Sequence, residues 1–119
     1  MAVDRRLTSS HYPYIPIHLQ LAGSEHLLEA LLDTGFDGDV VLPADLVPAN
    51  RTPDVYLPGR LADDSEFLAP AYSGVIRIDD FDAFMVAVMA LGGETLVGRG
   101  VADRFRITLD HGQMLTVEP

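Results

Sequence analysis

The triplet Asp33, Thr34 and Gly35 has the clearest chemical potential in this sequence. It follows an apolar stretch, residues 30–32, and occurs only once in the chain. Two carboxylates can hydrolyse a peptide bond with one water, because the ionised one takes the water's proton and the protonated one polarises the carbonyl. Since two adjacent carboxylates cannot both ionise cheaply, such a pair holds one proton and titrates as a unit. A single Asp33 per chain therefore predicts a symmetric homodimer, with the two copies on its two-fold axis.

The same triplet also suits a simple turn. Aspartate and glycine are favoured where a strand leaves a sheet, for reasons of turn geometry that need no catalysis. Taken alone, the three residues are therefore compatible with a purely structural role. The surrounding sequence has to distinguish a catalytic role from a structural one.

A second segment, about sixty residues further on, supplies that context. Leu96, Val97 and Gly98 form a hydrophobic-hydrophobic-glycine run. With Asp33 at this spacing before it, the chain resembles the retropepsin-like aspartic proteases, the single-domain relatives of retroviral proteases, and most closely the small bacterial proteins of that clan. The resemblance covers residues 13–118, and it implies that the run passes behind the active-site loop.

The resemblance also implies roles for residues of the loop. Asp33 from each chain would be the shared acid and base, and Thr34 would bond across the dimer axis. Gly35 would let the backbone turn sharply and leave room for the scissile peptide. The family often pairs an arginine after the glycine of the second segment with an aspartate two residues past the triplet, and Arg99 and Asp37 stand at these positions. We expect this ion pair to brace the loop, the alternative being a solvated surface pair.

The flap that would close over a substrate departs from the retroviral pattern. Retroviral flaps have a glycine-rich hairpin tip, whereas the corresponding place here, residues 60–66, is a charged turn. The candidate flap tip is Ala62, Asp63 and Asp64. Such a tip would repel acidic substrates and favour basic or neutral residues around the scissile bond. The alternative is a solvated surface loop.

Composition narrows the class of protein. With 119 residues, 48% of them hydrophobic, the chain is predicted to form one β domain, residues 13–119, after a flexible N-terminal arm, residues 1–12. No apolar run predicts a membrane span, and the polar N-terminus lacks the apolar segment of a secretion signal, which favours the cytoplasm. The net charge of −10 argues against a nucleic-acid partner, because phosphate contacts need clustered lysines and arginines.

No metal or organic cofactor is predicted. The sequence has no cysteine, which excludes thiolate ligands and a cysteine nucleophile. Its four histidines show no spacing typical of zinc ligands. The Gly-x-Gly at residues 98–100 lacks the third glycine of a dinucleotide-binding loop.

Alternation of apolar and polar residues is the dominant pattern of the chain. It predicts a hairpin, residues 15–21 and 26–32, whose second strand leads into Asp33. Further strands are predicted at 40–42, 55–61, 66–78, 83–91, 106–109 and 114–117, with short helical segments at 43–47 and 101–104. Many short strands with close turns predict an all-β barrel or sandwich with at most one or two short helices. The resemblance implies a closed barrel or sandwich of the retropepsin type.

The predicted function is that of an aspartic endopeptidase, a homodimer that hydrolyses a peptide or protein substrate with a water activated by the Asp33 pair. A second hypothesis is a noncatalytic peptide-binding β-barrel dimer, which keeps the protease fold and holds an extended peptide by β-augmentation. A third is a structural all-β dimer whose triplet is only a turn. Activity that depends on Asp33 separates the first hypothesis from the other two.

Overall fold

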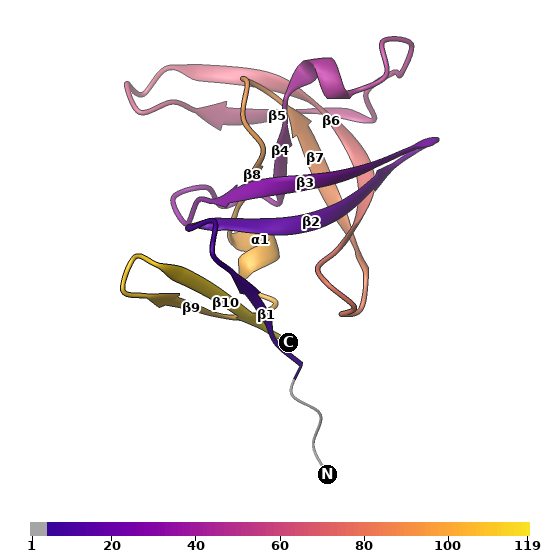
Figure 1. Ribbon diagram of the computed structural model, residues 1–119. Helices are drawn as coiled ribbons and strands as arrows, with labels where there is room; N and C mark the ends of the chain where they lie inside the picture. Colours follow the sequence, from indigo (N-terminus) through magenta and orange to yellow (C-terminus); the bar gives the residue numbers. More distant parts are fainter. Residues whose placement is uncertain (1–4) are drawn as a thin grey trace.

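The computed structural model describes residues 5–119 as a β-barrel with a small sheet beside it (Figure 1). The strands and helices in chain order are β1 Leu7–Ser9, β2 Tyr14–Leu21, β3 Ser24–Leu32, β4 Val40–Leu42, the 3-10 turn η1 Ala44–Leu46, β5 Val55–Arg60, β6 Glu66–Arg77, β7 Phe84–Ala90, β8 Leu96–Val97, the helix α1 Arg99–Ala102, β9 Arg106–Asp110 and β10 Met114–Glu118. The prediction of an all-β chain with short helical segments is confirmed.

The barrel is a seven-stranded sheet in the order β2-β3-β8-β4-β7-β6-β5. It closes because β2 pairs with β3 along one edge and with β6 along the other. The last strand, β5, pairs only with β6 and lies outside the closed ring. The closed barrel confirms the predicted architecture, whereas the predicted dimer remains a hypothesis about two chains.

The β2–β3 hairpin follows directly from the alternating pattern of the sequence. In β2 the side chains of Ile15, Ile17, Leu19 and Leu21 are buried in the barrel core. Gly23 has a φ of 81° in the turn between the strands, a left-handed conformation that glycine adopts at little cost. The second strand therefore returns across the barrel and ends where the sequence places the triplet.

A second, smaller group of apolar side chains lies outside the main core. Val41, Ala69, Ala71 and Met89 are buried together, and they come from β4, β6 and β7. Partly buried side chains pack against them from the loop after β3, from the β5–β6 hairpin and from the segment before and within β8, namely Phe36, Leu57, Phe67, Leu91 and Leu96. This cluster joins the hairpin to the loop that carries the triplet.

The N-terminal segment differs from the predicted flexible arm. Residues 7–9 form β1, which pairs antiparallel with β10, and Leu7 lies opposite Val117. The Leu7 side chain packs against the main core, and this apolar burial gives the segment a fixed place. Residues 1–4 of the predicted arm lie outside the described residues.

Candidate active site

The triplet begins directly after β3, at its junction with β8. Leu31 of β3 pairs with Leu96 of β8 in parallel register, and the Asp33 N–H donates a hydrogen bond of 2.9 Å to the Val97 carbonyl. The strand β8 also pairs with β4, so it runs between the strand that enters the loop and the strand that leaves it. The position of Asp33 is therefore set by the sheet itself.

The rest of the loop is tied to the start of α1 by backbone hydrogen bonds. The Arg99 N–H donates to the Phe36 carbonyl at 2.8 Å, and the Gly100 N–H donates to the Gly38 carbonyl at 3.0 Å. These bonds join segments about sixty residues apart in the sequence. Together with the bond at Asp33, they hold both ends of the loop against the same short stretch of chain.

Gly98 is where the two segments come into closest contact. Its N–H donates to the Asp39 carbonyl at 2.9 Å. A Cβ placed on Gly98 would lie 2.6 Å from the carbonyl oxygen of Phe36 and closer still to that of Gly38. Because these are backbone atoms, a side chain here could be accommodated only by moving the loop.

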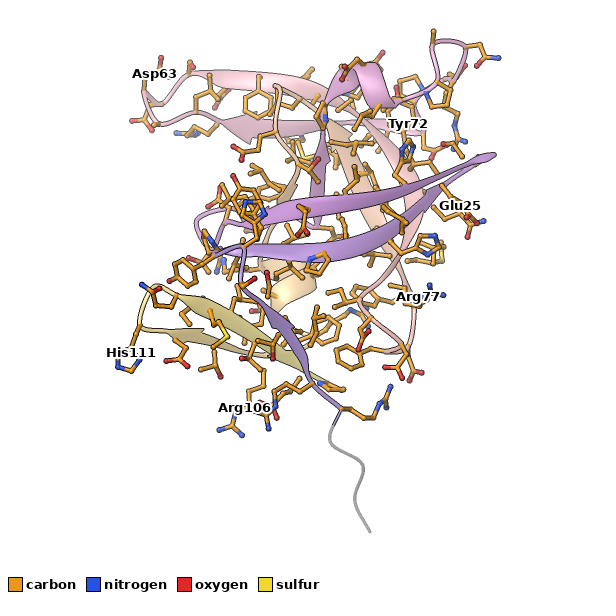
Figure 2. All side chains as sticks on the ribbon, viewed as in Figure 1. Glu25, Asp63, Tyr72, Arg77, Arg106 and His111 are labelled. Carbon is orange, nitrogen blue, oxygen red and sulfur yellow. The ribbon has the colours of Figure 1, made fainter. Side chains whose placement is uncertain are left out.

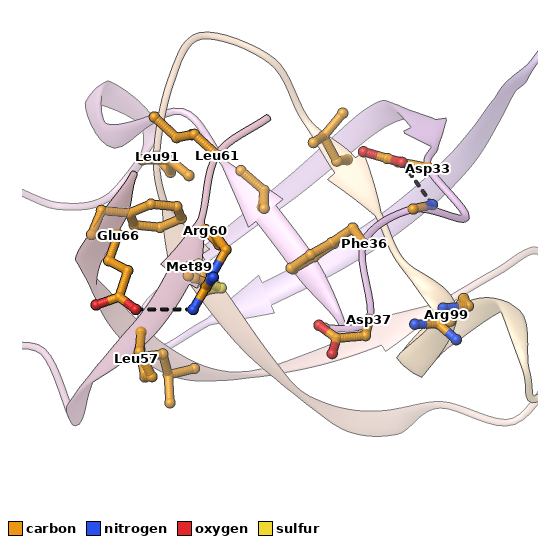
Figure 3. Close-up of a pocket in the computed structure, with 17 residues that line it drawn as sticks. Asp33, Phe36, Asp37, Leu57, Arg60, Leu61, Glu66, Met89, Leu91 and Arg99 are labelled. Atoms are coloured by element: carbon orange, nitrogen blue, oxygen red, sulfur yellow. Dashed lines mark hydrogen bonds and ion pairs between the residues drawn. The ribbon is translucent and has the colours of Figure 1, made fainter. Parts of the chain in front are cut away.

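The Asp33 carboxylate is half-buried and held by its own loop. Its Oδ1 accepts a hydrogen bond of 3.0 Å from the Gly35 N–H, drawn in Figure 3. The Thr34 side chain is exposed and makes no hydrogen bond within residues 5–119. Within that same range, no second carboxylate is hydrogen-bonded to Asp33. One chain therefore presents a single oriented carboxylate with an uncommitted hydroxyl beside it.

Asp33 lies on a groove with a volume of about 790 Å³, shown in Figure 3. We call this space the Asp33 groove. Of the residues singled out in the sequence, Asp33, Gly35, Asp37, Leu96 and Arg99 line it. Thr34, Val97 and Gly98 do not line the groove, and Val97 and Gly98 are buried behind it.

The other wall of the groove is the β5–β6 hairpin, which we call the flap hairpin because it carries the residues predicted to form a flap tip. Its contribution comes from residues 57–61 together with Glu66 and Phe67. The predicted tip residues Ala62, Asp63 and Asp64 form the turn of the hairpin, beyond the part that lines the groove. The hairpin that carries the predicted flap tip therefore borders the groove, and the strands next to the turn supply the groove residues.

The turn of the flap hairpin is held by local polar contacts. The Ser65 N–H and hydroxyl both donate to Asp63 Oδ1, at 2.9 and 2.6 Å. The hydrogen bonds from Ser65 lower the pKa of Asp63 below its ordinary value. Arg60 forms ion pairs with Glu66 at 3.0 Å and with Asp64 at 3.8 Å. The turn is therefore ordered without glycine, through exposed charges.

The overall architecture has counterparts among solved structures. The crystal structure of a retropepsin-like aspartic protease from Rickettsia conorii matches with a TM-score of 0.67 and 15% identity, over 95% of this chain and 89% of that one. The solution structure of simian foamy virus (mac) protease matches with a TM-score of 0.50 and 15% identity, over 74% of this chain and 91% of that one. The fold is retropepsin-like. No protein-family model and no curated protein matches the chain.

One detail of the predicted site is not formed in this retropepsin-like fold. Asp37 and Arg99 are both exposed, and no ion pair joins them in the described part of the chain. Figure 3 shows the two side chains with no interaction marked between them. Two solvated charges gain little by pairing, and the contact of Arg99 with the loop is made by its backbone N–H instead.

The carboxylate that braces the loop is Asp39, which the sequence analysis missed. Its Oδ2 accepts a hydrogen bond of 2.8 Å from the Ala87 N–H of β7. Its Oδ1 occupies the space where any residue other than glycine at Gly100 would place a Cβ. Its position in the sequence could have identified it, because Asp39 is an acidic residue directly before the buried residues of β4.

Two further observations concern metals and membranes. Among residues 5–119, no three histidine, aspartate or glutamate side chains are grouped so that they could bind a metal ion. The helices in that range are all too short or too polar to cross a bilayer.

Proposed function

We propose that this chain is an aspartic endopeptidase that acts as a homodimer, with Asp33 of each copy forming the catalytic pair. The observation that carries the proposal is the oriented Asp33 carboxylate at the groove beneath the flap hairpin. One carboxylate cannot act as acid and base at once, so a second copy has to supply its own. The retropepsin-like fold is consistent with this assignment.

The reaction needs no group beyond the two carboxylates and water. The ionised Asp33 takes a proton from the water as its oxygen attacks the carbonyl carbon of the substrate. The protonated Asp33 gives its proton to the carbonyl oxygen, which yields a tetrahedral diol. Collapse of the diol breaks the C–N bond, and a proton passes to the leaving nitrogen. The pair then again holds a single proton.

The groove favours an extended peptide as the substrate. Apolar side chains line much of it, including Leu57, Phe67, Met89 and Leu91. The strand β5 lies at the end of its sheet, so its backbone offers an edge to which an extended chain can pair. We therefore expect apolar side chains near the scissile bond of a peptide or protein substrate.

A noncatalytic peptide-binding dimer is the second candidate. The same edge of β5 and the same apolar groove would hold a peptide without cleaving it. The position of β5 also favours this candidate, because a peptide can pair with its edge without closure of the turn. Both functions need the groove, but only the endopeptidase needs Asp33 to take and give a proton.

The test is cleavage of a diverse peptide library between about pH 3 and pH 8, which covers the upper titration step of a carboxylate pair. The wild type is compared with Asp33→Asn, after sedimentation has shown that the variant has the same assembly state. Asp80→Asn is the matched control, since Asp80 lies in an exposed turn outside the groove. We expect cleavage by the wild type and the control and at least a hundredfold loss in Asp33→Asn.

Cleavage that persists in Asp33→Asn would contradict the proposal. A folded wild-type dimer that binds peptides but cleaves none at any pH would favour the noncatalytic module. A protein with neither cleavage nor peptide affinity would favour the purely structural hypothesis.

A further inference from the structure

The side chain of Phe36 occupies space in the Asp33 groove next to the carboxylate. Phe36 lines the groove together with Asp33, and its ring is partly buried. In Figure 3 the ring extends from the loop toward the flap hairpin and lies between Asp33 and Asp37. The Phe36 N–H donates a hydrogen bond of 3.2 Å to the Asp33 carbonyl, and its own carbonyl accepts one of 2.8 Å from the Arg99 N–H. These bonds belong to the backbone, so they do not depend on which side chain stands at position 36.

Two glycines hold the Phe36 ring in place. A Cβ on Gly38 would clash with the far end of the ring, and a Cβ on Gly98 would clash with its Cδ2 edge. The ring therefore lies directly against the backbone of both residues, which leaves it no room to move farther into the loop. A peptide that enters the groove meets a ring that cannot retreat.

The ring also covers part of an apolar floor. Phe36 packs against the cluster that contains Val41 and Met89. These two side chains are 4% and 6% exposed, and both line the groove. Removal of an apolar side chain from such a place leaves an apolar space that stays dry and accepts apolar ligands. A smaller residue at position 36 would therefore deepen the groove beside Asp33.

A second ring, that of Phe67, stands in the opposite wall of the groove. Phe67 pairs with Gly59 across the flap hairpin, and a Cβ on Gly59 would clash with its ring. Figure 2 shows Asp63 at the free end of this hairpin, where the contacts that order the turn are exposed. Exposed contacts cost little to break, so this wall can move outward, whereas backbone hydrogen bonds fix the loop. The ring of Phe36, on the fixed wall, therefore sets the limit on what fits.

We propose that Phe36 limits the size of the substrate side chains that flank the scissile bond, so that the protein cleaves peptides with small apolar residues there, such as alanine or valine. This inference rests on the proposed function and names its substrate class. In a symmetric dimer each copy supplies one ring, so the limit applies on both sides of the bond. An apolar pocket discriminates by about 10- to 200-fold for each methylene group that it cannot hold.

Replacement of Phe36 by smaller residues tests this limit. The wild type, Phe36→Leu and Phe36→Ala are compared on peptides that share one cleaved sequence and carry alanine, valine, leucine or phenylalanine beside the scissile bond. We expect the ratio of kcat/KM for the phenylalanine peptide to that for the alanine peptide to rise at least about tenfold in Phe36→Ala, and by a smaller factor in Phe36→Leu. Each ratio is taken within one protein, so a general loss of activity from a displaced Asp33 cancels.

Phe105→Leu is the matched control. Phe105 is also a partly buried phenylalanine, but it packs against the main core and does not line the groove. Its replacement should leave the ratio unchanged. Circular dichroism checks that each variant folds. If Phe36→Ala does not fold, Phe36→Leu carries the test, because leucine keeps an apolar contact with the cluster and is smaller than the ring.

Peptide binding gives a second measurement that needs no cleavage. Asp33→Asn and the double variant Asp33→Asn/Phe36→Ala are mixed with fluorescent peptides drawn from the same library, and anisotropy gives the dissociation constants. We expect the loss of the ring to tighten binding of phenylalanine peptides at least about tenfold relative to alanine peptides.

The outcomes separate this inference from the proposed function. Asp33-dependent cleavage with the same ratio in the wild type and in Phe36→Ala would overturn the size limit and leave the protease. A changed ratio in binding, without cleavage by the wild type, would support the size limit and count against the protease. A wild type that already prefers phenylalanine beside the bond, or an equal change in Phe105→Leu, would also overturn the size limit.

Discussion

The loop at residues 33–39 and the flap hairpin form opposite walls of one groove, yet they are held in different ways. The loop is joined to β8 and α1 by backbone hydrogen bonds, and Gly98 lies in contact with its carbonyl groups. The flap hairpin is ordered at its turn by exposed contacts of Arg60 and Asp63. One wall depends on close packing, and the other depends on surface charge.

This difference fits what the proposed peptidase would require of its two walls. A catalytic carboxylate has to be held within a fraction of an ångström, so its support should be unable to move. A flap has to open for the substrate and close again, so its contacts should be cheap to break. Exposed ion pairs contribute about 0–1 kcal/mol each, whereas overpacking a buried contact costs about 1–3 kcal/mol. Substitutions in the loop should therefore lower the free energy of unfolding more than substitutions in the flap hairpin do.

The largest effect is expected for Gly98→Ala. The new Cβ would clash with the backbone of the loop, and we expect the free energy of unfolding to fall by about 3 kcal/mol, with loss of any Asp33-dependent activity. Gly93→Ala is the matched control, because nothing lies within 4 Å of a Cβ there, and its stability should change by less than about 0.5 kcal/mol. Denaturant unfolding at one protein concentration measures both. Equal effects of the two variants would show that the loop is not close-packed.

The next largest effect concerns the carboxylate that braces the loop. Asp39→Ala removes the acceptor for the Ala87 N–H, and we expect a loss of about 1–3 kcal/mol of stability. Asp37→Ala changes an exposed side chain without an ion pair in the described part of the chain, and it should cost less than about 0.5 kcal/mol. Denaturant unfolding measures the loss of stability in each variant. A larger loss of stability in Asp37→Ala than in Asp39→Ala would support the ion pair of Asp37 with Arg99 that the sequence predicts.

A smaller effect is expected in the flap hairpin. Arg60→Met removes the ion pairs with Glu66 and Asp64, and global stability should fall by less than about 1 kcal/mol. Amide hydrogen exchange should accelerate at the Leu61 N–H, which bonds to the Ser65 carbonyl, and stay unchanged at the Asp33 N–H. If the Asp33 amide exchanged as fast as the Leu61 amide in the wild type, the contrast between the walls would fail.

The smallest effect is a pH dependence at the turn of the flap hairpin. Hydrogen bonds from Ser65 lower the pKa of Asp63 in the folded chain below the ordinary value of 3.8. The folded state therefore binds fewer protons than the unfolded state around this pH, and stability rises with pH there. This contribution is fully present above the ordinary pKa and is lost as the pH falls through the folded pKa.

Thermal melts between about pH 5 and pH 2 test this sign. The stability advantage of the wild type over Asp63→Asn should be largest at the upper end and shrink towards the lower end. Parallel pH profiles for the two proteins would show that Asp63 makes no such contribution.

Local patterns in the sequence were sufficient to predict most of the fold. The alternation in residues 15–21 predicts β2 because one face of that strand is buried, and a period of two is the direct consequence of strand geometry. The same reasoning locates the strand that leads into Asp33 and the short helical turn after β4. The segment 96–98 was found through its resemblance to a family, and its contact with the loop fits that prediction.

Other features were decided only by the tertiary structure. Local sequence does not reveal that Asp39, and not Asp37, reaches the Ala87 N–H, because that contact spans 48 residues. The pairing of β1 with β10 joins the two ends of the chain, and a three-residue strand carries little pattern of its own. The place of β9 at the end of the small sheet likewise depends on which strands become neighbours. Local patterns determine the elements, whereas long-range packing selects their partners, because only the folded chain brings distant residues into contact.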